Sequence, residues 1–435
     1  MKKIRALVLA ESCNPDWFSV PLVGWFHAEA LHRLTGPLDA HIVTQLRNRE
    51  AFLKRGWREG VDFTAIDSEA IARPMAKFDE GLRKLTGLGW TVSTALSGIP
   101  YAYFEHLVWK KFGPAIKSGQ WDVVHRVTSL SPTTPSVITG ACRRAGVPFV
   151  WGPINGGVPW PPGFGKQLRA EGEYLAYVRD AYKLLPFYGS TRRNASAIVI
   201  GSRATWDQMP AKYHDHCVYV PENGVDPLRF ARQVEGPVRS PLRVAFVGRL
   251  VPYKGADMLL EAAAPLVRAG KLVVDIIGDG DQMKQLQGIV AAEGISGGVK
   301  LDGWVEHAKM QERLVDSDVL GFPSIREFGG GVVIEAMALG LVPVVADYGG
   351  PNELVTDATG YRIPMGTRAE LVGRFRQVLG DLAADPSGLR SMGVRARERV
   401  LKHFTWDAKA RQMLDIYRWV CGEGAKPDFG MPFPD

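Results

Sequence analysis

The chain has 435 residues, of which 46% are hydrophobic and 23% charged, as expected of a soluble globular enzyme with two domains or more. Its net charge of +7 is spread over this length, so it favours anionic small ligands or an anionic bilayer surface over nucleic acid. The four cysteines are far apart, which argues against a disulfide framework or structural zinc and for a reducing cytoplasm. The first apolar run is too short for a signal peptide, and no run is long enough to span a membrane.

Apolar runs alternate with helical patterns in the first half of the chain, which predicts parallel strands joined by helices. We expect this α/β domain to cover residues 1–222. Its predicted strands are residues 4–10, 40–44, 122–128, 148–152, 197–201 and 218–221.

Polar and aromatic side chains near the ends of these strands are candidates for ligand contact, because loops that leave a sheet often carry function. The candidates are Asn14, Trp17, His125, Arg126, Asn155 and Trp160. A tryptophan face suits the apolar side of a sugar ring. The alternatives stay open: Trp17 could pack in the core, His125 could be structural, and the Gly- and Pro-rich loop 151–165 could be a rigid surface loop.

Two further segments of the first half have a distinctive composition. Residues 82–116 are rich in apolar and aromatic residues with basic residues at the edges, a mixture that can lie on an anionic membrane surface or pack on the domain's own sheet. Residues 167–188 have helical periodicity and are expected to cover the preceding loop.

The second half repeats the strand–helix rhythm more clearly. Its predicted strands are residues 243–248, 273–278, 299–304, 319–323 and 343–346. A polar linker at 231–241 leads into this domain, which we expect over residues 223–404. A helix at 405–421 is expected to return to the first domain, and the Pro- and Gly-rich tail 422–435 to be loosely ordered.

Two cations follow the first strand of this second domain. Arg249 can fork onto two phosphate oxygens, and Lys254 is a compact point charge, so together they can balance a diphosphate without a metal. Gly248 and Gly278 stand at the two ends of one strand–helix–strand repeat, and neither begins the G-x-G-x-x-G fingerprint of an NAD site. The alternative is two solvated cations on a loop.

The stretch 318–340 combines a buried strand, a glycine turn and a helix predicted from about Val332 to Gly340. Glycines at 329, 330 and 331 let a ligand approach the backbone, and the helix start offers N–H groups to an anion. Glu327 and Glu335 flank the turn and should reach past the anion towards hydroxyls. Phosphate in the middle with hydroxyls at both ends describes a nucleotide sugar. Alone, two glutamates eight apart are also common on solvated helix faces.

These motifs resemble glycosyltransferase family 4. The resemblance rests on the NGVD…F phrase from Asn223 to Phe230, the Arg249/Lys254 pair, the GDG turn at Gly278, the E-x7-E pair and the GG-x-x-E phrase at 349–353, in the family's order. It covers residues 220–417, whereas the first half matches in rhythm and in His125. Two features depart from the family pattern: the E-G-F-G order becomes Glu327-Phe328-Gly329-Gly330-Gly331, and the loop after Ala10 lacks paired glycines.

The resemblance implies a GT-B fold, with two Rossmann-like domains facing across a cleft. It implies a retaining glycosyltransferase that moves a sugar from a UDP- or GDP-sugar to a hydroxyl acceptor in polysaccharide, glycolipid or glycoconjugate synthesis. Catalytic roles are then expected for Glu327, His125, Arg249 and Lys254. Donor contacts are expected at Gly248, Arg249, Lys254, Gly278, Gly329, Gly330, Gly331, Val332 and Glu335, and acceptor contacts at Asn14, Trp17, Arg126, Asn155 and Trp160.

The expected partners are a nucleoside diphosphate sugar and a sugar or lipid-linked acceptor, with no cofactor and no metal. Nucleic acid is not expected, the oligomeric state is left open, and peripheral contact would place the enzyme at the inner face of the plasma membrane. The rival functions are a GT-B phosphorylase, a sugar-nucleotide epimerase and a non-catalytic GT-B scaffold. Product analysis would separate them, since release of UDP or GDP only with an acceptor indicates transfer.

Overall fold

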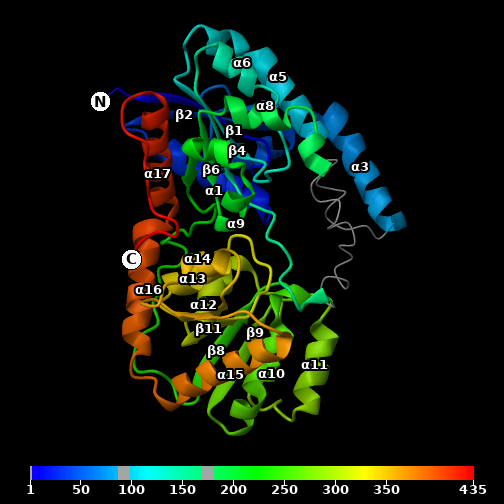
Figure 1. The fold of residues 1–435 in the computed structure, drawn as a ribbon, viewed down its shortest axis with the longest axis vertical. Helices are drawn as coiled ribbons and strands as arrows, with labels where there is room; N and C mark the ends of the chain where they lie inside the picture. Colours follow the sequence, from blue (N-terminus) through cyan, green and yellow to red (C-terminus); the bar gives the residue numbers. More distant parts are fainter. Residues whose placement is uncertain (1, 87–97, 166, 168–180) are drawn as a thin grey trace. The chain divides into compact units, whose positions relative to one another are not determined.

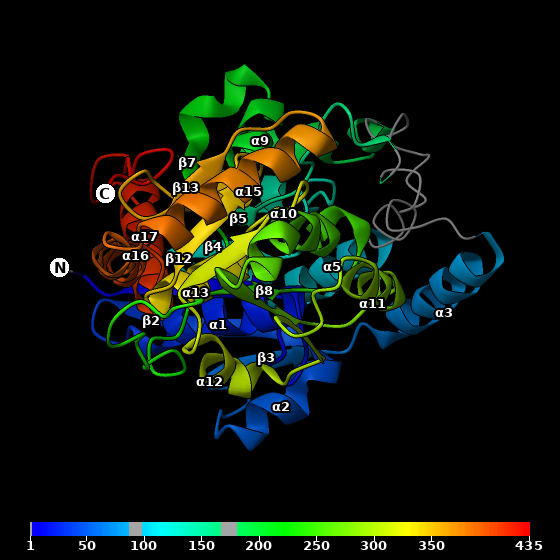
Figure 2. The same ribbon diagram turned by 90° about the horizontal axis from the view of Figure 1, so that it is seen from below.

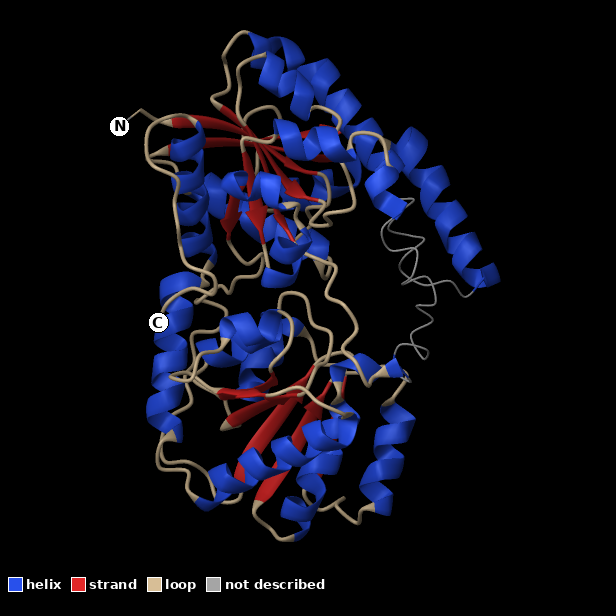
Figure 3. Cartoon of the chain, in the orientation of Figure 1, coloured by secondary structure: helices blue, strands red, loops and turns tan. Residues whose placement is uncertain are grey.

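A computed structural model of the chain describes residues 2–86, 98–165, 167 and 181–435. The chain divides into two compact units, each built around its own sheet (Figures 1 and 3). Unit 1 consists of Met1–Gly157, Gly172–Glu222 and Trp406–Gly430, and unit 2 of Val158–Glu171, Asn223–Thr405 and Met431–Asp435. The loop that begins at Val158 therefore belongs with the second half of the chain.

The sheet of unit 1 has seven parallel strands in the order β3-β2-β1-β4-β5-β6-β7. The strands are β1 (Ile4–Ala10), β2 (Leu38–Gln45), β3 (Phe63–Ile66), β4 (Val123–Thr128), β5 (Phe149–Ile154), β6 (Ala197–Ile200) and β7 (Cys217–Tyr219). All but β3 are predicted from the sequence. The four residues of β3 form too short an apolar run to stand out.

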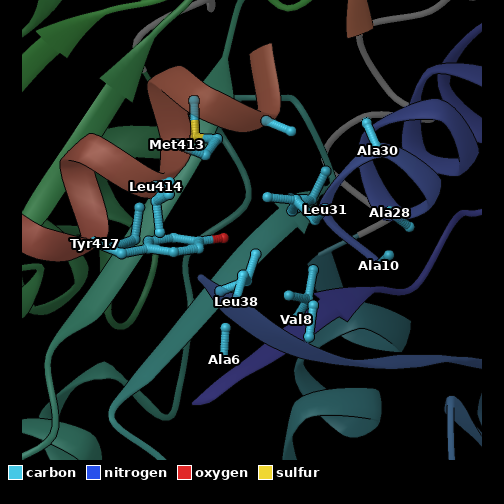
Figure 4. Packing of buried hydrophobic residues seen from close by; sticks show 14 of the residues in the cluster. Ala6, Val8, Ala10, Ala28, Ala30, Leu31, Leu38, Met413, Leu414 and Tyr417 are labelled. Carbon is cyan, nitrogen blue, oxygen red and sulfur yellow. The ribbon is translucent and has the colours of Figure 1, made fainter. Parts of the chain in front are cut away.

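Helices cover both faces of this sheet. Successive side chains of β1 point to opposite faces, and each face packs in its own hydrophobic cluster. Val8 packs in one cluster with Met413 and Tyr417 of α17 (Figure 4), and Leu9 packs in the other with Phe104 of α5. The helices are α1 (Val20–Arg33), α2 (Arg49–Lys54), α3 (Glu69–Thr86), α5 (Gly98–Lys117), α6 (Thr139–Arg144), α8 (Tyr188–Asn194), α9 (Arg203–Gln208) and α17 (Trp406–Val420), with 3-10 turns η1 (Leu46–Asn48), η3 (Ala181–Leu184) and η4 (Ala211–His216). Helix α17 packs along α1, so the end of the chain completes the core of unit 1.

The sheet of unit 2 has six parallel strands in the order β10-β9-β8-β11-β12-β13. The strands are β8 (Leu242–Val247), β9 (Leu272–Ile277), β10 (Val299–Gly303), β11 (Val319–Phe322), β12 (Val342–Ala346) and β13 (Tyr361–Ile363). The sequence predicts all but the three-residue β13. Strand order reverses between β8 and β11, and ligands of open α/β sheets bind outside the carboxyl ends of strands at such a switch point.

The helices of unit 2 are tied to one another by packing and by ion pairs. They are α10 (Ala256–Arg268), α11 (Met283–Ala292), α12 (Met310–Leu314), α13 (Gly331–Ala338), α14 (Gly350–Leu354), α15 (Arg368–Ala384) and α16 (Leu389–His403), with η5 (Pro252–Lys254) and η6 (His307–Lys309). Figure 2 shows α10 and α15 side by side, and Arg368 of α15 forms ion pairs with Asp257 (2.7 Å) and Glu261 (2.6 Å) of α10.

The structure describes only parts of the two segments that the sequence singles out in the first half, residues 82–116 and 167–188. Residues 87–97 of the expected membrane-contact segment and 168–180 of the expected covering helix lie outside the described residues. Helix α5, within the first segment, buries Tyr101, Phe104 and Val108 in the core of unit 1. None of the helices that the structure describes is long and apolar enough to cross a bilayer.

The tail differs from the loosely ordered segment that its composition predicts. Phe433 is 1% exposed and packs against the rings of Phe404 and His403. The buried Arg399 of α16 donates to the carbonyl oxygens of Phe433 and Pro434, both at 2.7 Å. The end of the chain is therefore fastened to unit 2 because an arginine supplies donors to its backbone.

His125 occupies a different environment from the open strand end that its position in the sequence suggests. It lies inside β4 and is fully buried, with Nδ1 2.6 Å from the Tyr417 hydroxyl and Nε2 2.6 Å from the Gly152 carbonyl oxygen. Since a carbonyl only accepts, Nε2 carries the proton and Nδ1 accepts from Tyr417. Burial lowers the pKa of His125 to about 4, so the structure gives it a core role.

This buried histidine makes the native state sensitive to acid. Its pKa in the folded chain, about 4, lies below the unfolded value near 6.5, so between these pH values only the unfolded chain takes up the proton. The free energy of unfolding should therefore fall as pH drops from about 6.5 to 4, with a slope of up to about 1.4 kcal/mol per pH unit from this site. His125→Gln, which keeps a donor and an acceptor, should remove that part of the slope in urea unfolding.

His27 provides an internal comparison. Burial lowers its pKa to about 3, and its Nε2 lies 2.8 Å from the carbonyl oxygen of Glu222. Its contribution should remain in His125→Gln, so the slope should decrease without vanishing. Above about pH 8 both histidines are neutral in the folded and the unfolded chain, and wild type and variant should show equal slopes there. An unchanged slope between pH 6.5 and 4 would contradict the buried neutral state of His125.

Candidate functional site

The turn after β11 has the geometry that its glycines predict. Gly330 adopts a left-handed conformation (φ 60°) as the N-cap of α13, and Gly340 does the same just beyond the helix (φ 84°). The helix begins at Gly331, one residue before the predicted start. Its first N–H groups, including that of Val332, have no acceptor within the helix and lie at the carboxyl end of the central strand β11.

The backbone of this turn is supported by a second pair of glycines. A Cβ atom at Gly349 would clash with the carbonyl oxygen of Glu327, and one at Gly350 would clash with that of Phe328. The N–H of Gly350 donates to the Glu327 carbonyl oxygen at 3.0 Å. Because backbone packs directly on backbone, the segment that carries Glu327 has little freedom to shift.

A similar close approach joins the ends of β8 and β9. Gly248 donates to the carbonyl oxygen of Ile277 at 3.0 Å, and a Cβ atom at Gly278 would clash with the carbonyl oxygen of Gly248. The GDG turn thus packs against the loop that carries Arg249, and only glycine fits at position 278. The predicted donor-binding glycines of unit 2 are therefore grouped at the carboxyl ends of its central strands.

The two predicted cations lie in the loop after β8, and both have polar partners. Lys254 Nζ forms an ion pair with Glu327 Oε2, and each of these side chains is 16% exposed. Arg249 donates to the hydroxyl of Tyr253 at 2.5 Å. The Tyr253 carbonyl accepts from Ser324 and Ile325 of the β11 loop, so the two loops form one connected surface. Lys254 and Glu327, 73 residues apart in sequence, meet at the β8/β11 switch point.

The second glutamate is part of a hydrogen-bond chain that the sequence does not reveal. Glu335, one turn into α13, accepts from His307 Nε2 at 2.7 Å. On the other side of the ring, Arg229 donates to His307 Nδ1 at 2.9 Å. His307 is not predicted as a site residue from the sequence, because no motif or spacing links it to Glu335.

Trp160 lies in unit 2, among the side chains around the β11 loop. The guanidinium of Arg326 stacks over the Trp160 ring at 5.0 Å and over Phe328 at 5.5 Å, and Tyr253 meets Trp160 edge-on at 6.3 Å. The Tyr348 hydroxyl donates to the Pro159 carbonyl at 3.1 Å. The loop that carries Trp160 thus packs against Arg326, the residue directly before Glu327.

The other predicted acceptor contacts belong to unit 1 and are dispersed. Arg126 is fully buried, stacks on Tyr101 at 4.1 Å and donates to the Thr134 carbonyl oxygen. Asn155 donates to Glu222 at 2.7 Å and Asn14 to Asn48 at 3.3 Å, and both are buried. Trp17 is 42% exposed. Strand position predicts which face a side chain takes but not whether another element covers that face.

Comparison with known proteins gives the family context. Residues 229–398 match the family Glycosyl transferases group 1. The chain is similar to alpha-maltose-1-phosphate synthase of Mycolicibacterium smegmatis, with 31% identity over 47% of this chain and 57% of that protein. It is also similar to a GDP-mannose-dependent monoacylated alpha-(1-6)-phosphatidylinositol monomannoside mannosyltransferase of Corynebacterium glutamicum, with 28% identity over 65% of this chain and 73% of that protein. The chain thus spans little more than half the length of the first of these relatives.

Among solved structures, the chain resembles that of Anabaena HepE in complex with UDP, with a TM-score of 0.59 and 15% identity over 95% of this chain and 99% of that one. The fold class is GT-B. The prediction of two Rossmann-like α/β units is therefore confirmed.

The close packing around the β11 loop gives a prediction for Gly350. In Gly350→Ala the new methyl group would clash with the Phe328 carbonyl, so we expect the free energy of unfolding to fall by about 1–3 kcal/mol. Gly288→Ala, in the middle of α11 where a Cβ atom meets nothing within 4 Å, is the matched control. It should raise stability by about 0.5–1 kcal/mol. Urea unfolding of both variants tests this, and equal effects would contradict the tight support of the loop.

Proposed function

We propose that this chain is a retaining glycosyltransferase, which moves a sugar from a UDP- or GDP-sugar to a hydroxyl of a sugar or lipid-linked acceptor. The observation that carries the proposal is the meeting of Lys254 and Glu327 at the β8/β11 switch point, beside the glycine turn and the start of α13. A cation, a carboxylate and free helix N–H groups at this position suit a phosphate joined to a hydroxyl-bearing ring. The names of the matched relatives favour transfer over phosphorolysis or epimerisation.

The diphosphate would lie on Arg249, Lys254 and the N–H groups from Gly330 to Val332. When the glycosidic bond breaks, negative charge grows on the leaving diphosphate, and fixed cations and amides stabilise that charge without rearranging. Lys254 has the reach for this role because it already contacts Glu327. It would then lie between the diphosphate and the glutamate.

The two glutamates would bind the two ends of the donor. Glu327, in the loop, would hold hydroxyls of the transferred sugar and stabilise positive charge on its ring as the bond breaks. Glu335, one turn further along α13, would accept hydrogen bonds from the ribose. No activated water is needed, which separates this chemistry from hydrolysis by paired carboxylates.

The two roles predict different behaviour for two alanine variants. Glu327→Ala should bind the free nucleoside diphosphate nearly as wild type does but lower turnover by on the order of 10²–10³-fold, as for loss of one fixed electrostatic contact. Glu335→Ala should weaken diphosphate binding by roughly 1.5–3 kcal/mol, as for lost charge-assisted hydrogen bonds. A thermal-shift panel of UDP, GDP and ADP with their sugars identifies the donor. Calorimetry and acceptor-dependent release of the diphosphate then give both quantities.

The exposed Glu398 on α16 supplies the control, since Glu398→Ala removes the same charge away from the site and should change neither quantity. Loss of diphosphate binding in Glu327→Ala with normal binding in Glu335→Ala would reverse the assignments. Wild-type behaviour in both variants would indicate two solvated acids.

The cation pair also predicts that transfer needs no divalent metal. Arg249 and Lys254 together offset about two negative charges of the diphosphate, so its charge can be balanced without a metal ion. Turnover should therefore persist at the wild-type rate in EDTA. Full loss of turnover with the chelator, restored by manganese, would refute metal independence. It would not affect the roles of the two glutamates, which the alanine variants test separately.

A further inference from the structure

The side chain of His307 lies between a cation and an anion within unit 2. Arg229 Nη2 is 2.9 Å from Nδ1 of the imidazole, and Glu335 Oε1 is 2.7 Å from Nε2. The Phe230 ring meets the imidazole at 5.8 Å between centroids, nearly edge-on. The three polar groups come from separate segments: the start of unit 2, the short helix η6 and α13.

The chemistry of these neighbours fixes the state of the ring. A guanidinium has only donors, so the nitrogen that faces Arg229 must be an acceptor without a proton. The proton of the neutral ring is then on Nε2, which donates it to Glu335. Arg229 thus selects the tautomer in which His307 is a hydrogen-bond donor to the glutamate.

We propose that His307 is a positioning residue for nucleotide recognition: it holds the carboxylate of Glu335 in the orientation that accepts the ribose hydroxyls. The inference rests on the proposed function, in which Glu335 binds the ribose. The side chain of a free glutamate samples many rotamers, and ordering it on ligand binding costs free energy. His307 engages one oxygen, Oε1, and orders the carboxylate before the ligand arrives.

This role differs from simply fastening η6 to α13. A structural tie would affect every ligand of the site to the same extent. A positioning role affects only ligands that present a ribose hydroxyl to Glu335. A nucleoside diphosphate and its 2′-deoxy and 3′-deoxy forms therefore separate the two, because they differ only in the sugar hydroxyls.

The experiment measures calorimetric affinities of UDP or GDP, whichever binds wild type, and of the matching deoxy diphosphates. His307→Ala should lower the affinity for the ribonucleotide about tenfold, as for loss of a hydrogen bond to a charged group. The affinity for the deoxy form that binds wild type more weakly should not change. His307→Gln, which can accept from Arg229 and donate to Glu335, should restore most of the preference. Lys309→Ala, an exposed change in the same short helix, should behave as wild type.

A double variant completes the test. With Glu335→Ala already present, His307→Ala should have no further effect on the ribonucleotide, because its partner is gone. Equal weakening of ribo and deoxy forms in His307→Ala, or failure of His307→Gln to restore the preference, overturns the positioning role. If Glu335→Ala abolishes the preference and His307→Ala keeps it, only this inference fails. If wild type shows no preference for the ribonucleotide, the ribose assignment of Glu335 fails as well.

Discussion

The candidate site depends on direct contact of backbone with backbone at the carboxyl ends of the central strands of unit 2. A Cβ atom at Gly255 would lie 2.7 Å from the Pro323 carbonyl oxygen, and one at Gly350 would clash with Phe328. These contacts join the loops after β8, β11 and β12 without intervening side chains. The backbone that carries the N–H groups, Lys254 and Glu327 is therefore held by close backbone packing, which is what electrostatic preorganisation requires.

The other end of β11 is fastened by charge. Asp318, at 0% exposure, accepts from the Arg243 backbone N–H at 3.0 Å and forms ion pairs with Arg239 (3.3 Å) and Arg390 (2.5 Å). A buried carboxylate is tolerated here because it has several donors. The strand that leads to the glycine turn is thus held at its start by an ion-pair network and at its end by backbone packing. Together these fix its register against β8.

Local features of this site could be predicted from the sequence, and long-range ones could not. Glycines at strand ends, the start of α13 and the Arg249/Lys254 pair follow from short motifs whose geometry is nearly independent of the rest of the chain. His307 lies 28 residues from Glu335 and 78 from Arg229, so its role appears only once the strands are paired. The burial of His125 and Arg126 is likewise not evident from the sequence, because α17 and α5 cover the two faces of β4. Strands β3 and β13 were missed because three or four residues carry too little periodicity.

Trp160 shows that the site is assembled from two separated parts of the sequence. Its loop precedes the boundary at residue 222, yet it packs within unit 2, where the Arg326 guanidinium contacts the rings of both Trp160 and Phe328. Both neighbours of Glu327 are thereby fixed, Arg326 by aromatic rings and Phe328 by the approach of Gly350. The side chain of Glu327 itself is held by Lys254. Three independent contacts therefore determine where this carboxylate lies. One of them is contributed by a segment that sequence order alone assigns to the other domain.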